Sequence, residues 1–187
     1  SCLIDDHDDN KFHMFLSYFP NNCGHIADTM NSHVAHAIST TGFEGPYKLH
    51  EHSKIADEWS HEPFATRGPN GEYVVYFSYT RNEPYFPTLC DCKALNNGIA
   101  NGTTPEICCN TTANACTYSE PKNLTRHTTV MRYTNDINSG KWSEIQYLWP
   151  SSERGPSNSD TNFVCKIFPN GTVLGFSRRH TEKGTNV

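Results

Sequence analysis

The sequence predicts an all-β protein built from repeated four-stranded antiparallel sheets. Asp9-Asn10, Asn70-Gly71 and Asn170-Gly171 each separate two extended runs of β-branched and aromatic residues, which is the pattern of a β-hairpin. A second pair of strands, joined by a turn of small residues, follows each of the first two hairpins. We therefore expect strands at residues 2–6, 11–19, 32–40, 47–53, 61–67, 72–80, 128–136, 142–148, 160–168 and 172–178.

Repeats of four antiparallel strands are typical of β-propeller blades. They predict one blade over residues 1–57, a second over 58–150 and part of a third over 151–187, about two and a half blades of a single propeller domain. A propeller needs at least about four blades to close into a ring. We therefore expect this chain to be a fragment of a propeller, or to be completed by another segment.

Composition excludes several classes of partner. The formal net charge is −5 and 19% of the residues are charged, without a basic stripe, which argues against a nucleic-acid partner. No apolar run reaches the roughly 18 to 20 residues that a membrane-spanning helix needs, so we expect no membrane span. The chain opens with "SCLIDD", without an initial Met or a signal-like apolar stretch, and this favours a mature or trimmed product.

Cysteines and glycosylation sequons predict an extracellular glycoprotein, secreted or on the cell surface. Residues 81–127 form an insertion in the second blade that is polar and rich in Asn, Thr and Cys. Because it lacks the apolar residues to build a core, we expect disulfide bridges to hold it on the surface. The expected disulfide cysteines are Cys2, Cys23, Cys90, Cys92, Cys108, Cys109, Cys116 and Cys165, and the expected N-glycan sites are Asn101, Asn110, Asn123 and Asn170.

The cysteine cluster could alternatively bind zinc, which needs four thiolate or imidazole ligands. Its spacing is C-x-C and C-C rather than paired C-x-x-C, and two sequons lie inside it, so disulfides are favoured. Eight cysteines allow roughly a hundred pairings, and the connectivity stays open. His33 and His36 fall on opposite faces of a strand, and His50 and His52 share one face but are too few for a metal site. We expect no metal and no cofactor.

Four motifs occur in an order and spacing that resemble a known family. They are an aromatic-rich second strand, an "AIS" strand followed by "GPY", a "HEP" step that opens the second blade and a "DTN" step that opens the third. Over about residues 2–80 and 128–178 the chain is similar to the family 43 glycoside hydrolases, and most similar to a divergent extracellular branch found in eukaryotes. The resemblance implies a five-bladed propeller with a sugar-binding funnel at its axis.

The resemblance also implies roles for individual residues. In the family, three carboxylates at the starts of the first strands act as general base, pKa-modulating group and general acid in an inverting hydrolysis. By position, Glu62 matches the pKa-modulating carboxylate of the family, and Asp160 lies nearest to the position of the general acid. Such a reaction needs two carboxyl groups roughly 6.5 to 9.5 Å apart. His61, Trp59 and Asn162 would contact the sugar, although strand neighbours face opposite ways, so only one of His61 and Glu62 is expected to point into the funnel.

Two departures from the family pattern weigh against catalysis. Ser1-Cys2 stand where the base is expected as an Asp, and Asp160-Thr161-Asn162 stand where a Glu, a small residue and Pro are expected. An amide cannot donate a titratable proton. The sequence therefore favours a non-catalytic carbohydrate-binding or structural propeller, with other chains of an extracellular assembly as further partners. The alternative is an active inverting glycoside hydrolase acting on an arabinan, a xylan or another extracellular polysaccharide.

Overall fold

The computed structural model describes residues 2–6, 10–19, 32–56, 60–79, 107–110, 115–118, 128–149 and 159–180. Side chains are described in these ranges except at 2–3, 5–6, 107–110, 115–118, 159–161 and 179–180. Every regular element in the described ranges is a β-strand, so the all-β prediction is confirmed. In this part of the chain, no helix occurs that could cross a membrane.

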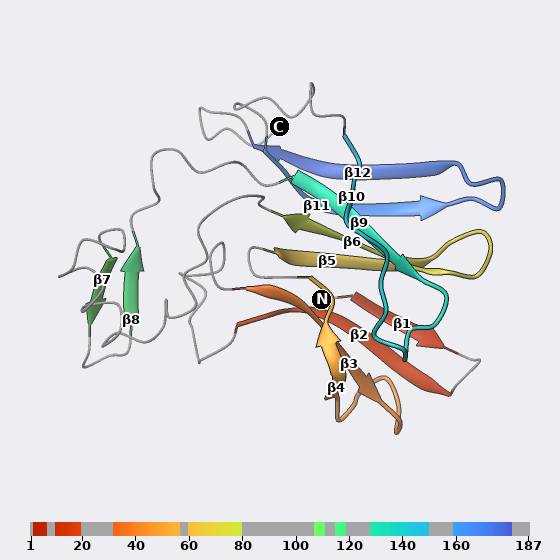
Figure 1. Cartoon of the computed structure of the whole chain (residues 1–187), viewed down its shortest axis with the longest axis horizontal. Helices are drawn as coiled ribbons and strands as arrows, with labels where there is room; N and C mark the ends of the chain where they lie inside the picture. Colours follow the sequence, from red (N-terminus) through yellow and green to blue (C-terminus); the bar gives the residue numbers. More distant parts are fainter. Residues whose placement is uncertain are drawn as a thin grey trace.

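The strands form two four-stranded antiparallel sheets and two hairpins (Figure 1). Sheet 1 has the strand order β1-β2-β3-β4 and sheet 2 the order β10-β9-β6-β5. Sheet 3 is the hairpin β11-β12, and β7 and β8 pair within the insertion. The strands are β1 (Cys2–Asp6), β2 (Lys11–Tyr18), β3 (His33–Ser39), β4 (Lys48–Lys54), β5 (Ser60–Arg67), β6 (Tyr73–Tyr79), β7 (Ile107–Asn110), β8 (Ala115–Tyr118), β9 (Thr128–Thr134), β10 (Gln146–Tyr147), β11 (Ser159–Ile167) and β12 (Val173–His180).

Outside the insertion the strands lie where the sequence predicts them, and β10 is the one that differs most. It covers two residues instead of the expected 142–148. The guanidinium of Arg132 donates to the carbonyl oxygens of Trp142 and Ser143, and the Ser143 hydroxyl accepts from the Tyr133 N–H, so side chains hold this segment in place of a regular strand ladder. The strand pair β7-β8 was not expected, because the polar insertion shows little of the alternation that identifies a strand.

The three sheets stack face to face, and an apolar core fills each gap. We call the face that a sheet turns to the next sheet along the chain its back face, and the opposite face its front face. Between sheets 1 and 2 the core combines back-face residues of β2 and β3 with front-face residues of β5, β6 and β9, namely Phe15, Val34, Ala65, Val75, Phe77 and Val130.

The gap between sheets 2 and 3 repeats this arrangement. Val74 and Tyr76, on the back face of sheet 2, pack against Phe163 on the front face of sheet 3. The rings of Tyr76 and Phe163 have centroids 4.9 Å apart. Since Val74 and Tyr76 alternate along β6 with the front-face residues Val75 and Phe77, β6 is buried on both faces.

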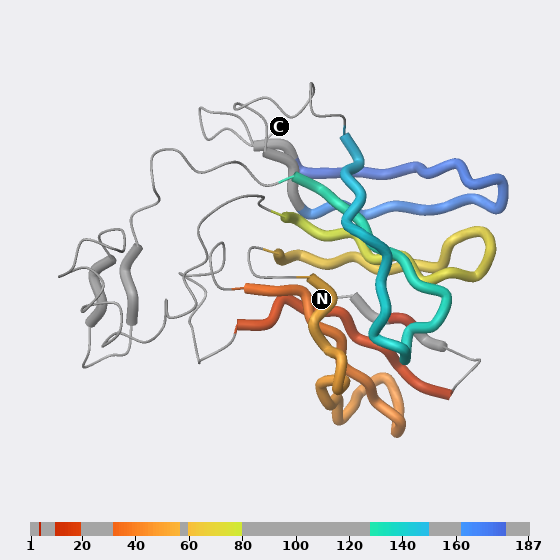
Figure 2. The backbone as a smooth tube through the Cα atoms, viewed as in Figure 1, coloured from red at the N-terminus to blue at the C-terminus, as the bar shows by residue number. Residues whose placement is uncertain are grey.

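The hairpins β5-β6 and β11-β12 are equivalent, with residue 71 of one corresponding to residue 171 of the other. Gly71 and Gly171 have φ angles of 87° and 81°, which glycine adopts at low cost. In each turn a backbone N–H, of Gly68 or Phe168, donates over 2.8 Å to the carbonyl four residues on. Both turns project on the same side of the molecule (Figure 2). An offset of 100 residues, the difference between 171 and 71, therefore relates the two hairpins.

Cys165 was expected to form a disulfide, but in the structure it is a free, half-buried thiol. Its neighbour across the gap between the sheets is Tyr76. Burial raises the pKa of the Cys165 thiol, and a hydrogen bond with Tyr76 opposes that rise. The side chains of the other seven cysteines lie outside the described residues, although the backbone register places Cys109 opposite Cys116, a separation that a disulfide can span.

Replacing Phe15 by Ala should destabilise the fold strongly. Its side chain is 0% exposed between sheets 1 and 2, so the change leaves a cavity and should lower the free energy of unfolding by about 3 to 5 kcal/mol. Phe43, which is 63% exposed, is the matched control, and Phe43→Ala should change stability by less than about 0.5 kcal/mol. Urea unfolding followed by circular dichroism measures both, and equal effects would contradict the stacked core.

Alkylation tests the environment of Cys165. In the native protein at pH 8 the thiol should react with iodoacetamide more slowly than in urea, because burial raises its pKa and the thiolate is the reactive form. Tyr76→Phe should slow the native reaction further, since the hydroxyl that favours the thiolate is removed. Peptide mass spectrometry gives the rate for this residue alone, and a disulfide-linked peptide that contains Cys165 would refute a free thiol.

Candidate functional site

Glu62 lies at a β-bulge close to the start of β5. The register between β5 and β6 shifts between His61 and Phe64, and Glu62 has a φ angle of 55°. A strand residue other than glycine with positive φ is uncommon, and bulges of this kind change the direction of a side chain. The backbone N–H of Glu62 donates to Ser17 Oγ of sheet 1 over 2.9 Å, which fixes the bulge.

The Glu62 carboxylate accepts hydrogen bonds from sheets 2 and 3. Ser78 Oγ donates to its Oε2 over 3.1 Å, and the backbone N–H of Asn162 donates to the same oxygen over 3.2 Å. With its nitrogen turned toward the carboxylate, the Asn162 side-chain amide donates to Oε1 over 2.6 Å and to Oε2 over 3.0 Å. The carboxylate still has a side-chain exposure of 31%, so a ligand can reach it.

His61 lies beside this carboxylate rather than on the opposite face. Its Nε2 is 3.9 Å from Glu62 Oε2, and its side chain is 9% exposed. The expectation that only one of the two residues could point to the site was wrong, because it assumed regular strand alternation. The bulge at Glu62 breaks that alternation and brings both side chains to one place.

Asn162, rather than Asp160, occupies the position in sheet 3 that Glu62 occupies in sheet 2. The offset of 100 residues relates Glu62 to Asn162, and Asn162 has the same φ angle of 55° at a register shift between Thr161 and Val164. Asp160 corresponds to Ser60, and its backbone pairs with Arg179. By this correspondence the counterpart of Glu62 carries an amide, and a catalytic role for Asp160 stays a prediction. The side chain of Asp160 is outside the described residues.

Ser17 and Ser78 were missed by the sequence reasoning, although a signal for them was present. Each serine comes after two large apolar or aromatic residues and before a Tyr, near the end of the second strand of its hairpin, in "FLSY" and "YFSY". Among the other expected site residues, Trp59, Asn101 and Asn123 lie outside the described residues, as does the side chain of Asn110. Asn170 is exposed in the β11-β12 turn, where its Oδ1 accepts from the Thr172 N–H over 3.0 Å.

A column of histidine rings lies on the back face of sheet 1. His13 Nδ1 and His36 Nε2 are 2.8 Å apart and share a hydrogen bond, with both side chains buried. Ring centroids continue from His36 to His50 at 5.2 Å and from His50 to His52 at 5.8 Å. His33 lies on the other face, against Tyr18, as predicted. Within the described residues, no group of three or more potential ligands is arranged to hold a metal ion.

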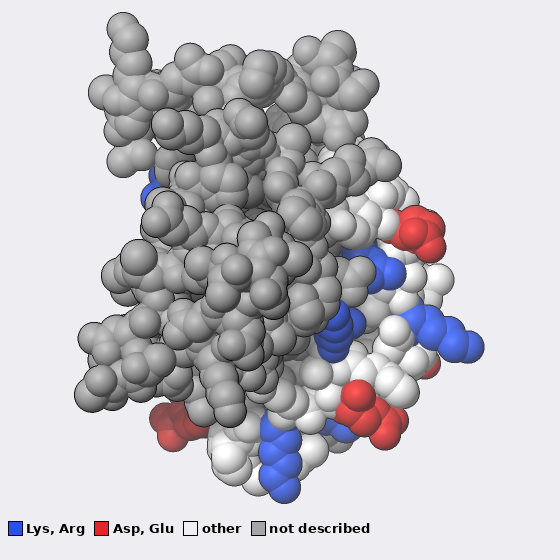
Figure 3. Space-filling view, turned by 60° about the vertical axis from the view of Figure 1, so that its left-hand side comes forward, with Lys and Arg blue, Asp and Glu red and all other residues white. Residues whose placement is uncertain are grey.

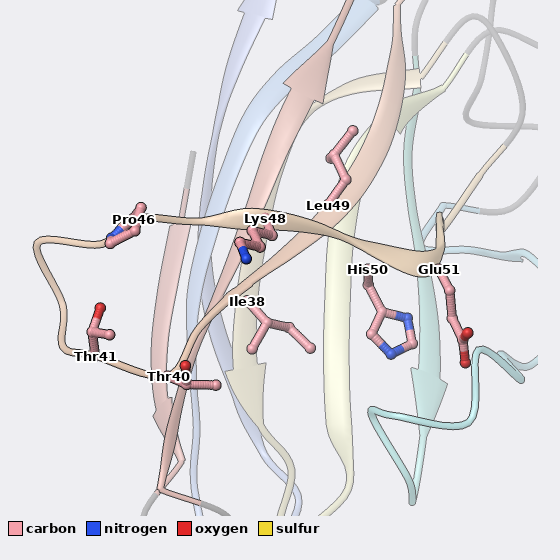
Figure 4. Close-up of a pocket in the computed structure, with 8 residues that line it drawn as sticks. All are labelled: Ile38, Thr40, Thr41, Pro46, Lys48, Leu49, His50 and Glu51. Atoms are coloured by element: carbon pink, nitrogen blue, oxygen red, sulfur yellow. The ribbon is translucent and has the colours of Figure 1, made fainter.

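An open pocket of about 440 Å³ lies at the outer edge of sheet 1, between β3, β4 and the loop that joins them. Figure 4 shows Ile38 and His50 on one side of the strands and Leu49 on the other. None of the residues around Glu62 lines this pocket, and its lining mixes aliphatic and charged side chains without a concentrated polar group: Ile38, Thr40, Thr41, Pro46, Lys48, Leu49, His50 and Glu51.

Charges are mixed on the described surface. Figure 3 shows Lys and Arg side chains interspersed with Asp and Glu over the described part of one face. This distribution agrees with the low charge content of the sequence. Comparisons of the chain with protein-family models, with curated proteins and with solved structures found no match.

Asn162→Asp should destabilise the site and the contact between sheets 2 and 3. The change keeps the shape of the side chain but replaces an amide donor by a second carboxylate against Glu62. A loss of about 1 to 3 kcal/mol in the free energy of unfolding at pH 7 is expected. Asn170→Asp is the matched control, because the oxygen that accepts from Thr172 is retained. Denaturant titration compares the two, and equal stability would contradict the Glu62–Asn162 contact.

Proposed function

We propose that this chain belongs to an extracellular glycoprotein and forms part of a propeller-type domain that binds carbohydrate around Glu62 without hydrolysing it. The resemblance to family 43 glycoside hydrolases supports the choice of ligand. Cysteine content and sequons support the extracellular location. The repeated face-to-face packing of sheets 1, 2 and 3 supports the propeller, because successive blades of a propeller pack in this way.

The amide at Asn162 is the observation that carries the non-catalytic assignment. Inverting hydrolysis needs two carboxyl groups roughly 6.5 to 9.5 Å apart, which leaves room for a water molecule between the general base and the sugar. At the position equivalent to Glu62 in the next sheet the side chain is an amide, and it donates to the Glu62 carboxylate over 2.6 Å. An amide has no titratable proton to give to a leaving group.

The same cluster suits recognition of sugar hydroxyl groups. Glu62 offers carboxylate oxygens, with Asn162 and His61 beside it at the starts of β11 and β5, and the buried Ser78 near the end of β6 holds the carboxylate in place. A few fixed polar groups of this kind orient a ligand in its site. The bulges hold these groups in place before a ligand arrives, which reduces the entropy cost of binding.

Glu62→Gln tests this proposal with a glycan array and with soluble arabinan and xylan. The wild-type chain should bind at least one glycan without releasing reducing sugar, and Glu62→Gln should weaken that binding about tenfold or more because the charged acceptor is lost. Glu51→Gln is the control, since Glu51 has a side-chain exposure of 79% on β4.

Other outcomes separate the alternatives. Turnover of a polysaccharide that Glu62→Gln abolishes would replace the binding module by an active hydrolase. Absence of both binding and turnover across the array would contradict a carbohydrate-related function altogether.

A further inference from the structure

The histidine column on the back face of sheet 1 begins with a buried pair. His13 and His36 are 0% and 1% exposed, and one hydrogen bond of 2.8 Å joins His13 Nδ1 to His36 Nε2. The His36 ring stacks on Phe15 of the core, with centroids 5.0 Å apart. The His13 ring lies 6.3 Å from the Tyr73 ring of sheet 2, measured between centroids. The pair therefore lies within the contact between sheets 1 and 2.

The hydrogen bond in this pair limits how many protons the two rings can hold. One of the facing ring nitrogens must donate and the other must accept, so one of them carries no proton. If both rings were charged, two N–H groups would face each other and the bond could not form. The intact pair therefore takes up at most one proton beyond its neutral state, whereas two separate histidines take up two below about pH 6.

The titratable and charged groups around the pair come from both sheets. On the faces turned toward it they are Asp6, Lys11, Lys48, His50 and His52 of sheet 1 and Arg67, Tyr73, Tyr79, Arg132 and Tyr147 of sheet 2, and Glu51, Asp136, Lys141 and Glu144 are exposed beside them on β4 and in the segment 135–145. The arginine charges oppose a positive charge on the pair. They do not alter the limit of one proton, because the hydrogen bond itself sets it.

Two further contacts cross the gap that contains the pair. The connection between β9 and β10 lies beside sheet 1 (Figure 1), and its Trp142 meets the Phe15 ring edge-on with centroids 6.0 Å apart. Ser17 Oγ, on the same strand as His13, accepts from the Glu62 N–H over 2.9 Å. The contact between the sheets thus also holds the bulge that carries Glu62.

We propose that the His13–His36 pair is an acid-sensitive link that holds sheet 1 against sheet 2. Below about pH 6, chains in which the pair is broken bind at least one proton more than chains in which it is intact. Acid therefore favours the broken pair, and the stability that the link provides is complete above about pH 7 and is lost as the pH falls through about 6. Since the bond between Ser17 and Glu62 crosses the same gap, the geometry at Glu62 changes with the link, whatever ligand binds there.

Urea unfolding of the 187-residue chain at roughly pH 7.5 and pH 5 tests the link. His36→Gln places an amide where His36 Nε2 lies, and this amide can bond to His13 without titrating. Between the two pH values the folding equilibrium constant of the wild type should fall about thirtyfold more than that of His36→Gln, because one histidine proton is left uncompensated. His52→Gln is the control, since His52 has a side-chain exposure of 57%, and it should respond to pH like the wild type.

Imidazole nitrogen NMR of the unaltered chain gives a second test, which does not require a variant to fold. At about pH 5 the signals of the folded protein should report at most one charged ring in the pair, and two charged rings should occur only in the unfolded signals. Folded protein with both rings charged, or equal pH dependence in the wild type and His36→Gln, would overturn the proposal. Neither measurement involves a glycan, so the result is independent of carbohydrate binding at Glu62.

Discussion

Burial of β6 on both faces is the constraint on which the rest of the fold depends. All but the last of its seven residues are buried, because sheet 1 covers one face and sheet 3 the other. A strand in this position must be apolar or uncharged throughout, and "YVVYFSY" meets that requirement. The two cores therefore form on a single strand, so sheets 1 and 3 are both positioned by the same element. β12 has the equivalent place in sheet 3, but its described side chains are exposed.

The polar side chains that are buried between the sheets need hydrogen-bond partners. His13 and His36 share a hydrogen bond of 2.8 Å, and the His36 ring stacks on Phe15 with centroids 5.0 Å apart. Ser60 Oγ accepts from the Val34 N–H over 3.0 Å, which ties the start of β5 to β3. Buried groups without such partners would each cost about 1 to 3 kcal/mol. The bond between Ser60 and Val34 thus helps to fix the position of β5 relative to sheet 1, and with it the position of Glu62.

The strands and turns could be predicted from sequence because they depend on local signals. Asn70-Gly71 and Asn170-Gly171 mark hairpins through backbone preferences, and the alternation around them identifies the strands. The contact between Glu62 and Asn162 could not be predicted, because it joins residues 100 positions apart across two sheets. The length of β10 depends on Arg132, whose hydrogen bonds with Trp142 and Ser143 have no sequence signature. The bulge at Glu62 was missed because "HEP" fits a regular strand as well as a bulge.

The bulges at Glu62 and Asn162 explain why the site lies where it does. Positive φ costs about 1 to 2 kcal/mol for a residue such as Glu and less for Asn, so the structure must compensate at Glu62. It does so through the Ser17 bond to the backbone and the Ser78 and Asn162 bonds to the carboxylate. Because the same bulge recurs at the same point of two equivalent hairpins, it is a property of the repeat rather than of one residue. The repeat thus presents one side chain at this end of each of the two hairpins, a carboxylate in sheet 2 and an amide in sheet 3.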